Sequence, residues 1–127
     1  MHCKARFVIA LGLLATAPAV AQTLDGADIE SLIGDKRVLL STPYGLELPL
    51  RYSGNGDVTG DISGFTMASM FTPSETGRWW VDGDQLCQQF PTWYDGQTYC
   101  FAIEQTGERT ISWRRNDGLE GTARIEG

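Results

Sequence analysis

The chain has 127 residues, with 16 Asp and Glu against 10 Lys and Arg, and its formal net charge is −6 at pH 7. This length suits one small domain and leaves no room for separate catalytic and binding domains. The acidic charge argues against a nucleic-acid partner, because proteins bind phosphate backbones with Lys and Arg.

The stretch Met1–Ala21 has the pattern of a cleavable bacterial export signal. Lys4 and Arg6 precede an almost wholly apolar run, Phe7–Val20, and the stretch ends in the small-residue pattern Ala-Val-Ala. The run is shorter than the ~20 residues of a membrane-spanning helix, so no membrane span is predicted. Cleavage leaves a single β domain, residues 22–127, with eight basic and sixteen acidic side chains and a charge of −8. We expect this domain in the periplasm or secreted into the medium.

One short helix is predicted at Leu24–Ile33, near the start of the mature chain. Asp25 can cap its first turn, Ile29 and Leu32 lie on one apolar stripe, and Gly34 can end it. Short segments rich in β-branched and aromatic residues follow, separated by glycine-containing turns that are typical of β-strands and hairpins. The predicted strands are Arg37–Ser41, Glu47–Tyr52, Asp57–Ile62, Thr66–Phe71, Arg78–Val81, Gln85–Phe90, Thr98–Glu104, Arg109–Arg114 and Thr122–Ile125.

Two cysteines, Cys87 and Cys100, remain after the signal is removed. Two thiols in an oxidising compartment are expected to form a disulfide. The bridge would close a loop of 14 residues and stabilise the fold by about 3 kcal/mol. A redox role is disfavoured, because redox-active pairs usually have C-x-x-C spacing.

Turn signals predict the register of the four consecutive strands from Arg78–Val81 to Arg109–Arg114. The register follows from a two-residue turn at Asp82-Gly83, from Cys87 opposite Cys100, and from a three-residue loop at Thr106–Glu108. The facing pairs are then Trp79 with Leu86, Leu86 with Phe101, Phe101 with Trp113, and Ile103 with Ile111. Large apolar side chains thus share one face, and the disulfide lies on the other. The predicted fold is all-β: a small antiparallel meander or barrel of about eight strands with one short N-terminal helix.

Little catalytic chemistry is left to the mature chain. The only histidine, His2, lies in the signal, so Ser–His and Cys–His mechanisms and imidazole metal sites are excluded. Asp82 and Asp84 flank a tight turn, where carboxylates are solvated and do not form an acid–base pair. We therefore expect no catalytic residue, no cofactor and no enzyme activity. A glycan hydrolase acting through carboxylates is the weakest hypothesis.

The segment Gly54–Gly64 could offer Asn55, Asp57 and Asp61 as oxygen ligands for calcium. Its spacing differs from that of an EF-hand loop and lacks the closing glutamate. A tight turn that leads into a strand is the favoured interpretation, and no metal site is predicted.

Aromatic residues and one basic doublet provide the candidate binding residues, which are Trp80, Trp93, Tyr94, Arg114 and Arg115. Trp80 should point to the opposite face from its neighbour in the strand, and Trp93 and Tyr94 lie in a loop inside the disulfide ring. Exposed aromatic side chains suit sugar stacking or a protein contact. The favoured alternatives are that Trp93 folds back to plug the barrel and that the two arginines pair with nearby acidic residues.

The second half of the chain resembles a group of small exported bacterial proteins of unknown function. The resemblance is carried by the segment Gly77–Cys87, with its G-x-W…G-D-x-L-C pattern, by Cys100 before Phe101, and by the Asp117-Gly118 turn. It implies an exported β domain with a disulfide, and it supplies no catalytic residues.

The favoured hypothesis is a non-enzymatic periplasmic or secreted binding or interaction module. Its acidic charge suits a basic protein, and its aromatic loop suits a glycan. The alternatives are a small-ligand carrier with a calycin-like barrel and an inhibitor of a basic enzyme. The row of large side chains favours a filled interior and so argues against the carrier.

Overall fold

The computed structural model describes residues 21–41, 45–63 and 73–127. The strand predicted at Thr66–Phe71 and nearly all of the predicted signal lie outside these ranges. No helix among the described residues is long and apolar enough to cross a membrane.

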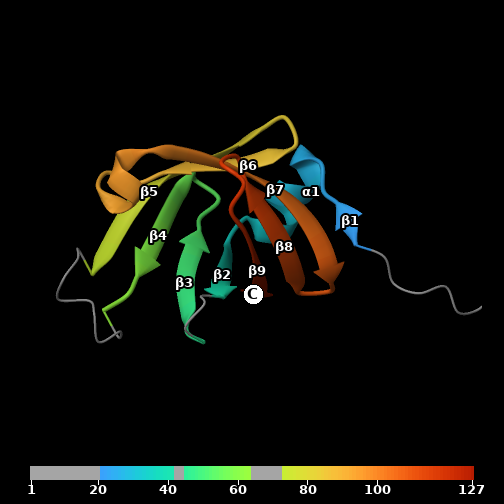
Figure 1. Cartoon of the computed structure of the whole chain (residues 1–127), viewed down its shortest axis with the longest axis horizontal. Coiled ribbons are helices and arrows are strands. Elements are labelled where there is room, and N and C mark those ends of the chain that lie inside the picture. The colour runs from blue at the N-terminus through green and yellow to red at the C-terminus, as the bar shows by residue number, and fades with distance from the viewer. Residues whose placement is uncertain (1–20, 42–44, 64–72) are drawn as a thin grey trace, which may run out of the picture.

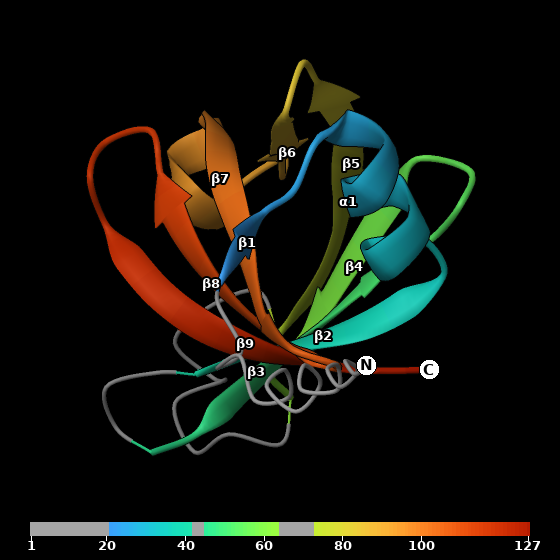
Figure 2. The same ribbon diagram turned by 90° about the vertical axis from the view of Figure 1, so that its right-hand side faces the viewer.

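Eight antiparallel strands close into a barrel, as the sequence predicts (Figure 1, Figure 2). They are β2 (Lys36–Ser41), β3 (Glu47–Tyr52), β4 (Asp57–Asp61), β5 (Ser74–Asp82), β6 (Gln85–Gln89), β7 (Thr98–Gly107), β8 (Thr110–Arg115) and β9 (Glu120–Glu126). From β2 to β8 each strand pairs with the next strand in the sequence. The strand β9 pairs with both β8 and β2, and this closes the barrel. The short strand β1 (Gln22–Thr23) adds to β7, and the 3₁₀ helix η3 (Trp93–Gly96) connects β6 to β7.

The helix α1 (Gly26–Ile33) begins two residues later than predicted. Asp25 caps it, because its carboxylate accepts a hydrogen bond from the backbone N–H of Asp28 at 2.8 Å. The side chains of Ile29 and Ile33 are buried, and the helix packs against β2, β5 and β6. The helix therefore covers one side of the barrel interior, whereas η3 lies on the opposite side (Figure 1).

The predicted pairing of the disulfide hairpin is confirmed. Cys87 faces Cys100, Leu86 faces Phe101, and the two cysteines are bonded. Trp80 faces Cys87 from the adjacent strand on the outer surface. The disulfide thus fixes β6 and β7 to each other.

The predicted register of the other two hairpins is wrong by two residues. Trp79 faces Gln88, because the β5–β6 loop is Gly83-Asp84 and not Asp82-Gly83. Gly83 has φ 61°, a conformation that glycine adopts without strain.

In the β7–β8 hairpin Trp113 faces Ile103, not Phe101, and Ile111 faces Gln105, not Ile103. Gly107 faces Thr110, which leaves a two-residue loop, and an irregularity lies between Gln105 and Gly107. A shift of two residues keeps every side chain on its face of the sheet. The large apolar residues therefore share the interior as predicted, although not as directly facing pairs.

The barrel interior and the inner face of α1 form one core. Its buried members are Leu24, Ile29, Ile33, Val38, Leu50, Tyr52, Val58, Trp79, Leu86, Phe90, Ile103, Ile111, Ala123 and Ile125. Each large side chain buried here contributes about 1.5–3 kcal/mol relative to its exposed state.

Candidate functional site

The barrel interior contains a cavity of about 120 Å³. Its lining is contributed by α1 and by five strands and two loops of the barrel: Ile33, Val38, Leu40, Tyr52, Leu86, Gln88, Tyr94, Tyr99, Phe101, Ile103, Ile111, Trp113, Arg115 and Leu119. The expectation of a filled interior is therefore wrong. Phe101 and Trp113 both line this space and meet edge to face, with ring centroids 5.4 Å apart.

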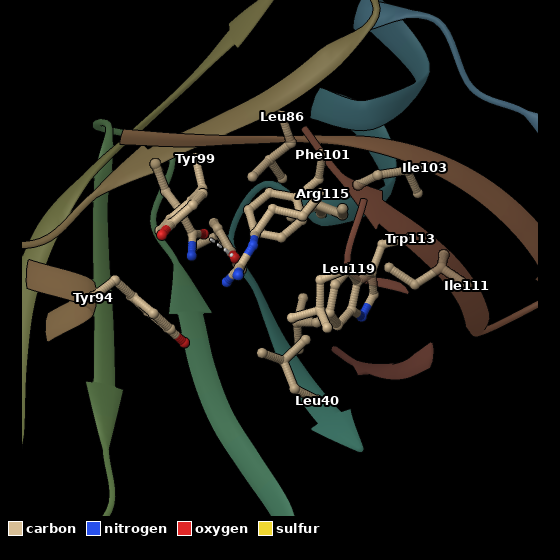
Figure 3. A pocket seen from close by; sticks show the side chains of 14 residues that line it. Leu40, Leu86, Tyr94, Tyr99, Phe101, Ile103, Ile111, Trp113, Arg115 and Leu119 are labelled. Carbon is tan, nitrogen blue, oxygen red and sulfur yellow. Dashed lines mark hydrogen bonds between the residues drawn. The ribbon is translucent and has the colours of Figure 1, made fainter. Parts of the chain in front are cut away.

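The mouth of the cavity combines apolar and polar side chains. Leu119, in the β8–β9 loop, is 51% exposed, and Tyr94 of η3 is 37% exposed, so the cavity reaches the surface between them. Figure 3 shows the guanidinium of Arg115 and the phenol end of Tyr94 directed toward the middle of the pocket. A molecule that enters would pass between an aromatic ring and an arginine.

Arg115 is held in place by an acidic residue and an aromatic ring. Its Nε and Nη2 donate to the two carboxylate oxygens of Asp117, at 2.9 and 2.7 Å, and its guanidinium carbon lies 4.0 Å from the ring centre of Tyr99. The hydrogen bonds raise the pKa of Arg115 and lower the pKa of Asp117 to about 2. The pair is therefore ionised at neutral pH, and only 16% of the Arg115 side chain is exposed.

Deeper in the cavity, Tyr52 donates a hydrogen bond of 2.5 Å to Oε1 of Gln88. Burial, followed by the nearby phenol of Tyr94, raises the pKa of Tyr52 well above its ordinary value, so this phenol stays neutral. The indole N–H of Trp113 is also buried, and none of the described residues accepts a hydrogen bond from it. The cavity wall thus has a donor that lacks an acceptor.

The loop that carries Tyr94 is anchored by a single carboxylate. Glu75 on β5 accepts hydrogen bonds from the backbone N–H groups of Thr92 and Trp93, at 2.8 and 2.9 Å, and from the Thr92 hydroxyl. Burial acts to raise the pKa of Glu75, but these hydrogen bonds outweigh it and lower the pKa. Tyr94 itself has φ 57°, an unusual backbone conformation for a residue other than glycine.

The structure places Trp93 against the core and not free on the surface. Its ring is 5.1 Å from that of Phe90, and it lies so close to Gly60 of β4 that a Cβ there would overlap it. This is the favoured sequence interpretation, in which Trp93 folds back onto the barrel. Trp80 is 39% exposed and lies on the outer surface beside the disulfide.

The basic doublet divides between the two faces of β8. Arg114 points outward and forms an ion pair with Glu120, whereas Arg115 points inward and lines the cavity. Of the candidate binding residues, the structure brings only Tyr94 and Arg115 together at the cavity. Sequence reasoning missed Tyr99 and Leu119, and strand alternation from Trp113 would have placed Arg115 on the inner face.

The three residues considered as calcium ligands, Asn55, Asp57 and Asp61, are not brought together into one site. Asp57 and Asp61 stand at opposite ends of β4, about 13 Å apart at ~3.3 Å per residue. Asn55 and Asp61 each accept a hydrogen bond from a backbone N–H two residues later. In the described part of the chain no three His, Cys, Asp or Glu residues are grouped as a metal site would need. The described cavity wall contains no carboxylate, so it offers binding groups without a carboxylate acid–base pair.

No family model, no curated protein and no solved structure matches the chain. The resemblance to exported bacterial proteins therefore stays a prediction from the sequence.

Proposed function

We propose that this protein is an exported, non-enzymatic binding protein that holds one small, mainly apolar molecule inside its barrel. The observation that carries the proposal is the interior cavity of about 120 Å³ that reaches the surface beside Tyr94 and Leu119. Small-molecule sites are concave and mainly apolar, with a few polar groups, and this cavity has that composition.

The size of the cavity sets the size of the ligand. A dry apolar cavity of about 150 Å³ in another protein binds benzene. A cavity slightly smaller than that, but open at one end, suits a single ring or a short branched chain with its polar end at the mouth. Larger ligands of the kind that wide calycin barrels carry would require Tyr94 or Leu119 to move.

The small-ligand carrier replaces the interaction module as our preferred hypothesis. Trp93, a main candidate for contact with a glycan or a basic protein, instead packs on Phe90 and over Gly60. Arg114 and Arg115 each pair with an acidic neighbour. Three of the five candidate binding residues are thus engaged by the fold, whereas Trp80 and Tyr94 stay exposed.

We place this activity in the bacterial periplasm or the medium. The pattern of Met1–Ala21 supports export, and the Cys87–Cys100 disulfide is compatible with an oxidising compartment. A carrier for a small apolar compound would act there without a cofactor.

Titration with ethylbenzene tests the proposal. A ligand that binds only the native state stabilises it by RT ln(1 + [L]/Kd), so we expect a rise in melting temperature and a change in tryptophan fluorescence. Leu40→Phe, which fills the cavity, should abolish both effects. Leu46→Phe, the same substitution at an exposed residue that does not line the cavity, should preserve them.

Leu119→Trp gives a second obstruction at the exposed mouth, in case Leu40→Phe fails to fold. No melting shift for the wild type up to the solubility limit of ethylbenzene would contradict the proposal. So would equal shifts in the wild type and in both obstructed variants.

A further inference from the structure

We infer that the ligand carries a neutral carbonyl oxygen, which accepts a hydrogen bond from Arg115 at the mouth of the cavity. This inference rests on the proposed function, and it names the chemical class of the molecule that the cavity holds.

Arg115 has hydrogen-bonding capacity that the protein does not use. A guanidinium has five N–H donors, and Asp117 takes one from Nε and one from Nη2. Among the described residues no acceptor is found for the other three. The side chain is largely enclosed and points toward the middle of the pocket (Figure 3), so these donors are available to water or to a ligand in the mouth.

Trp113 lies two residues earlier on the inner face of β8, but it supplies no donor at the mouth. Its indole nitrogen lies on the side of the ring away from the Arg115 guanidinium (Figure 3), and that ring edge packs against Gly121 of β9. Oε1 of Gln88, an acceptor deep in the cavity, already receives the Tyr52 hydroxyl. At the mouth the phenol of Tyr94 can donate or accept, whereas the guanidinium of Arg115 can only donate, so Arg115 favours a ligand that presents an acceptor there.

The charges around the mouth favour a neutral acceptor over a carboxylate. Asp117 neutralises Arg115 through two hydrogen bonds, so a bound carboxylate would meet a second negative charge close by. The mature chain adds its general negative charge. A ketone, aldehyde, ester or amide oxygen receives the same N–H groups without this repulsion.

Three compounds of similar size separate the effects of apolar contact, of a neutral acceptor and of a negative charge. Ethylbenzene has no acceptor, acetophenone has a neutral carbonyl, and benzoate has a carboxylate. We expect the wild type to bind acetophenone at least about tenfold more tightly than ethylbenzene, as a hydrogen bond to a charged group would give. Benzoate should bind no more tightly than ethylbenzene. Calorimetry measures all three dissociation constants.

Two variants of the full mature chain test the role of Arg115. Arg115→Met keeps an apolar stem and should remove the preference for acetophenone over ethylbenzene. Asp117→Asn keeps the guanidinium but removes the competing charge, so benzoate should bind about tenfold more tightly than to the wild type.

The possible outcomes separate this inference from the proposed function. If ethylbenzene binds and acetophenone binds no more tightly, the carbonyl inference is overturned while the cavity remains a binding site. If benzoate is the tightest ligand of the wild type, the inference is likewise overturned. If none of the three compounds binds, the proposed function itself fails.

Discussion

Tyr52 and Gln88 form a polar pair within an otherwise apolar wall. Both residues are buried, their side chains share a hydrogen bond of 2.5 Å, and the Tyr52 ring meets Trp79 edge to face at 5.4 Å. Because burial keeps the phenol protonated, it remains a donor throughout the physiological pH range. The pair thus places a satisfied polar group in the wall of the cavity.

Removal of one partner from this pair should be costly. Tyr52→Phe leaves the Gln88 carbonyl oxygen buried without its donor, so we expect the free energy of unfolding to fall by about 1–3 kcal/mol. Urea denaturation measures the change. The double variant Tyr52→Phe/Gln88→Leu removes both polar groups and should recover part of the loss. A single variant as stable as the wild type would show that the hydrogen bond contributes nothing.

The Arg115–Asp117 pair makes stability depend on pH. The pKa of Asp117 is about 2 in the folded chain, below its value of ~3.9 in an unfolded one. Its contribution to stability is therefore complete above the unfolded pKa and is lost as the pH falls through the folded pKa. We expect the denaturation midpoint of the wild type to be higher than that of Asp117→Asn. The difference between the two midpoints should be largest at about pH 6 and should shrink toward about pH 2. A difference that stays constant with pH would contradict this assignment.

At the scale of the elements, alternation along the strands proved more predictable than pairing between them. The inner face of β7 and β8 was predicted correctly, because apolar side chains recur at every second residue. The facing partners of Trp79 and Trp113 were wrong, because loop residues alone do not determine where a turn is centred. Gly83-Asp84 and Asp82-Gly83 are equally plausible two-residue turns until packing selects one of them.

The strands β6 and β7 are joined both by backbone hydrogen bonds and by the Cys87–Cys100 disulfide. Asn116 also reaches it, because its backbone N–H donates to the carbonyl oxygen of Cys100 at 2.8 Å. The Cys87–Cys100 bond thus lies at a point where the β6–β7 pair meets the β8–β9 loop at the cavity mouth.

Loss of the disulfide should destabilise the whole barrel. For the 14-residue loop that Cys87 and Cys100 close, we expect the double variant Cys87→Ala/Cys100→Ala to lose about 3 kcal/mol of unfolding free energy. Chemical denaturation measures it, and wild type kept under reducing conditions is the control. Equal stability of the variant and the oxidised wild type would contradict a structural role.

For the whole molecule, pairing with β7 holds residues 22–24 against the barrel. Gln22 and Thr23 pair with Gln105 and Glu104 of β7, directly after the predicted cleavage position. The N–H of Leu24 then donates to the carbonyl oxygen of Ile103 at 2.9 Å. These contacts would hold the new N-terminus against the barrel.

The export prediction can be checked on the protein recovered from a bacterial host. Mass spectrometry should find a chain that begins at Gln22, with no free thiol at Cys87 or Cys100. Alkylation before and after reduction provides the control for the thiols. A chain that retains Met1 would contradict both the cleavage and the proposed location.

The sequence by itself determined the fold class, the disulfide pair and the face on which the large apolar residues of β5 to β8 lie. These features depend on local chemistry: glycine turns, alternating side chains and the small number of cysteines. It did not determine the cavity. Whether Phe101 and Trp113 fill the interior depends on how residues from different strands pack in three dimensions, and alternation along a single strand carries no such information. Only the tertiary structure brings Tyr94, from a distant loop, to the same mouth as Arg115.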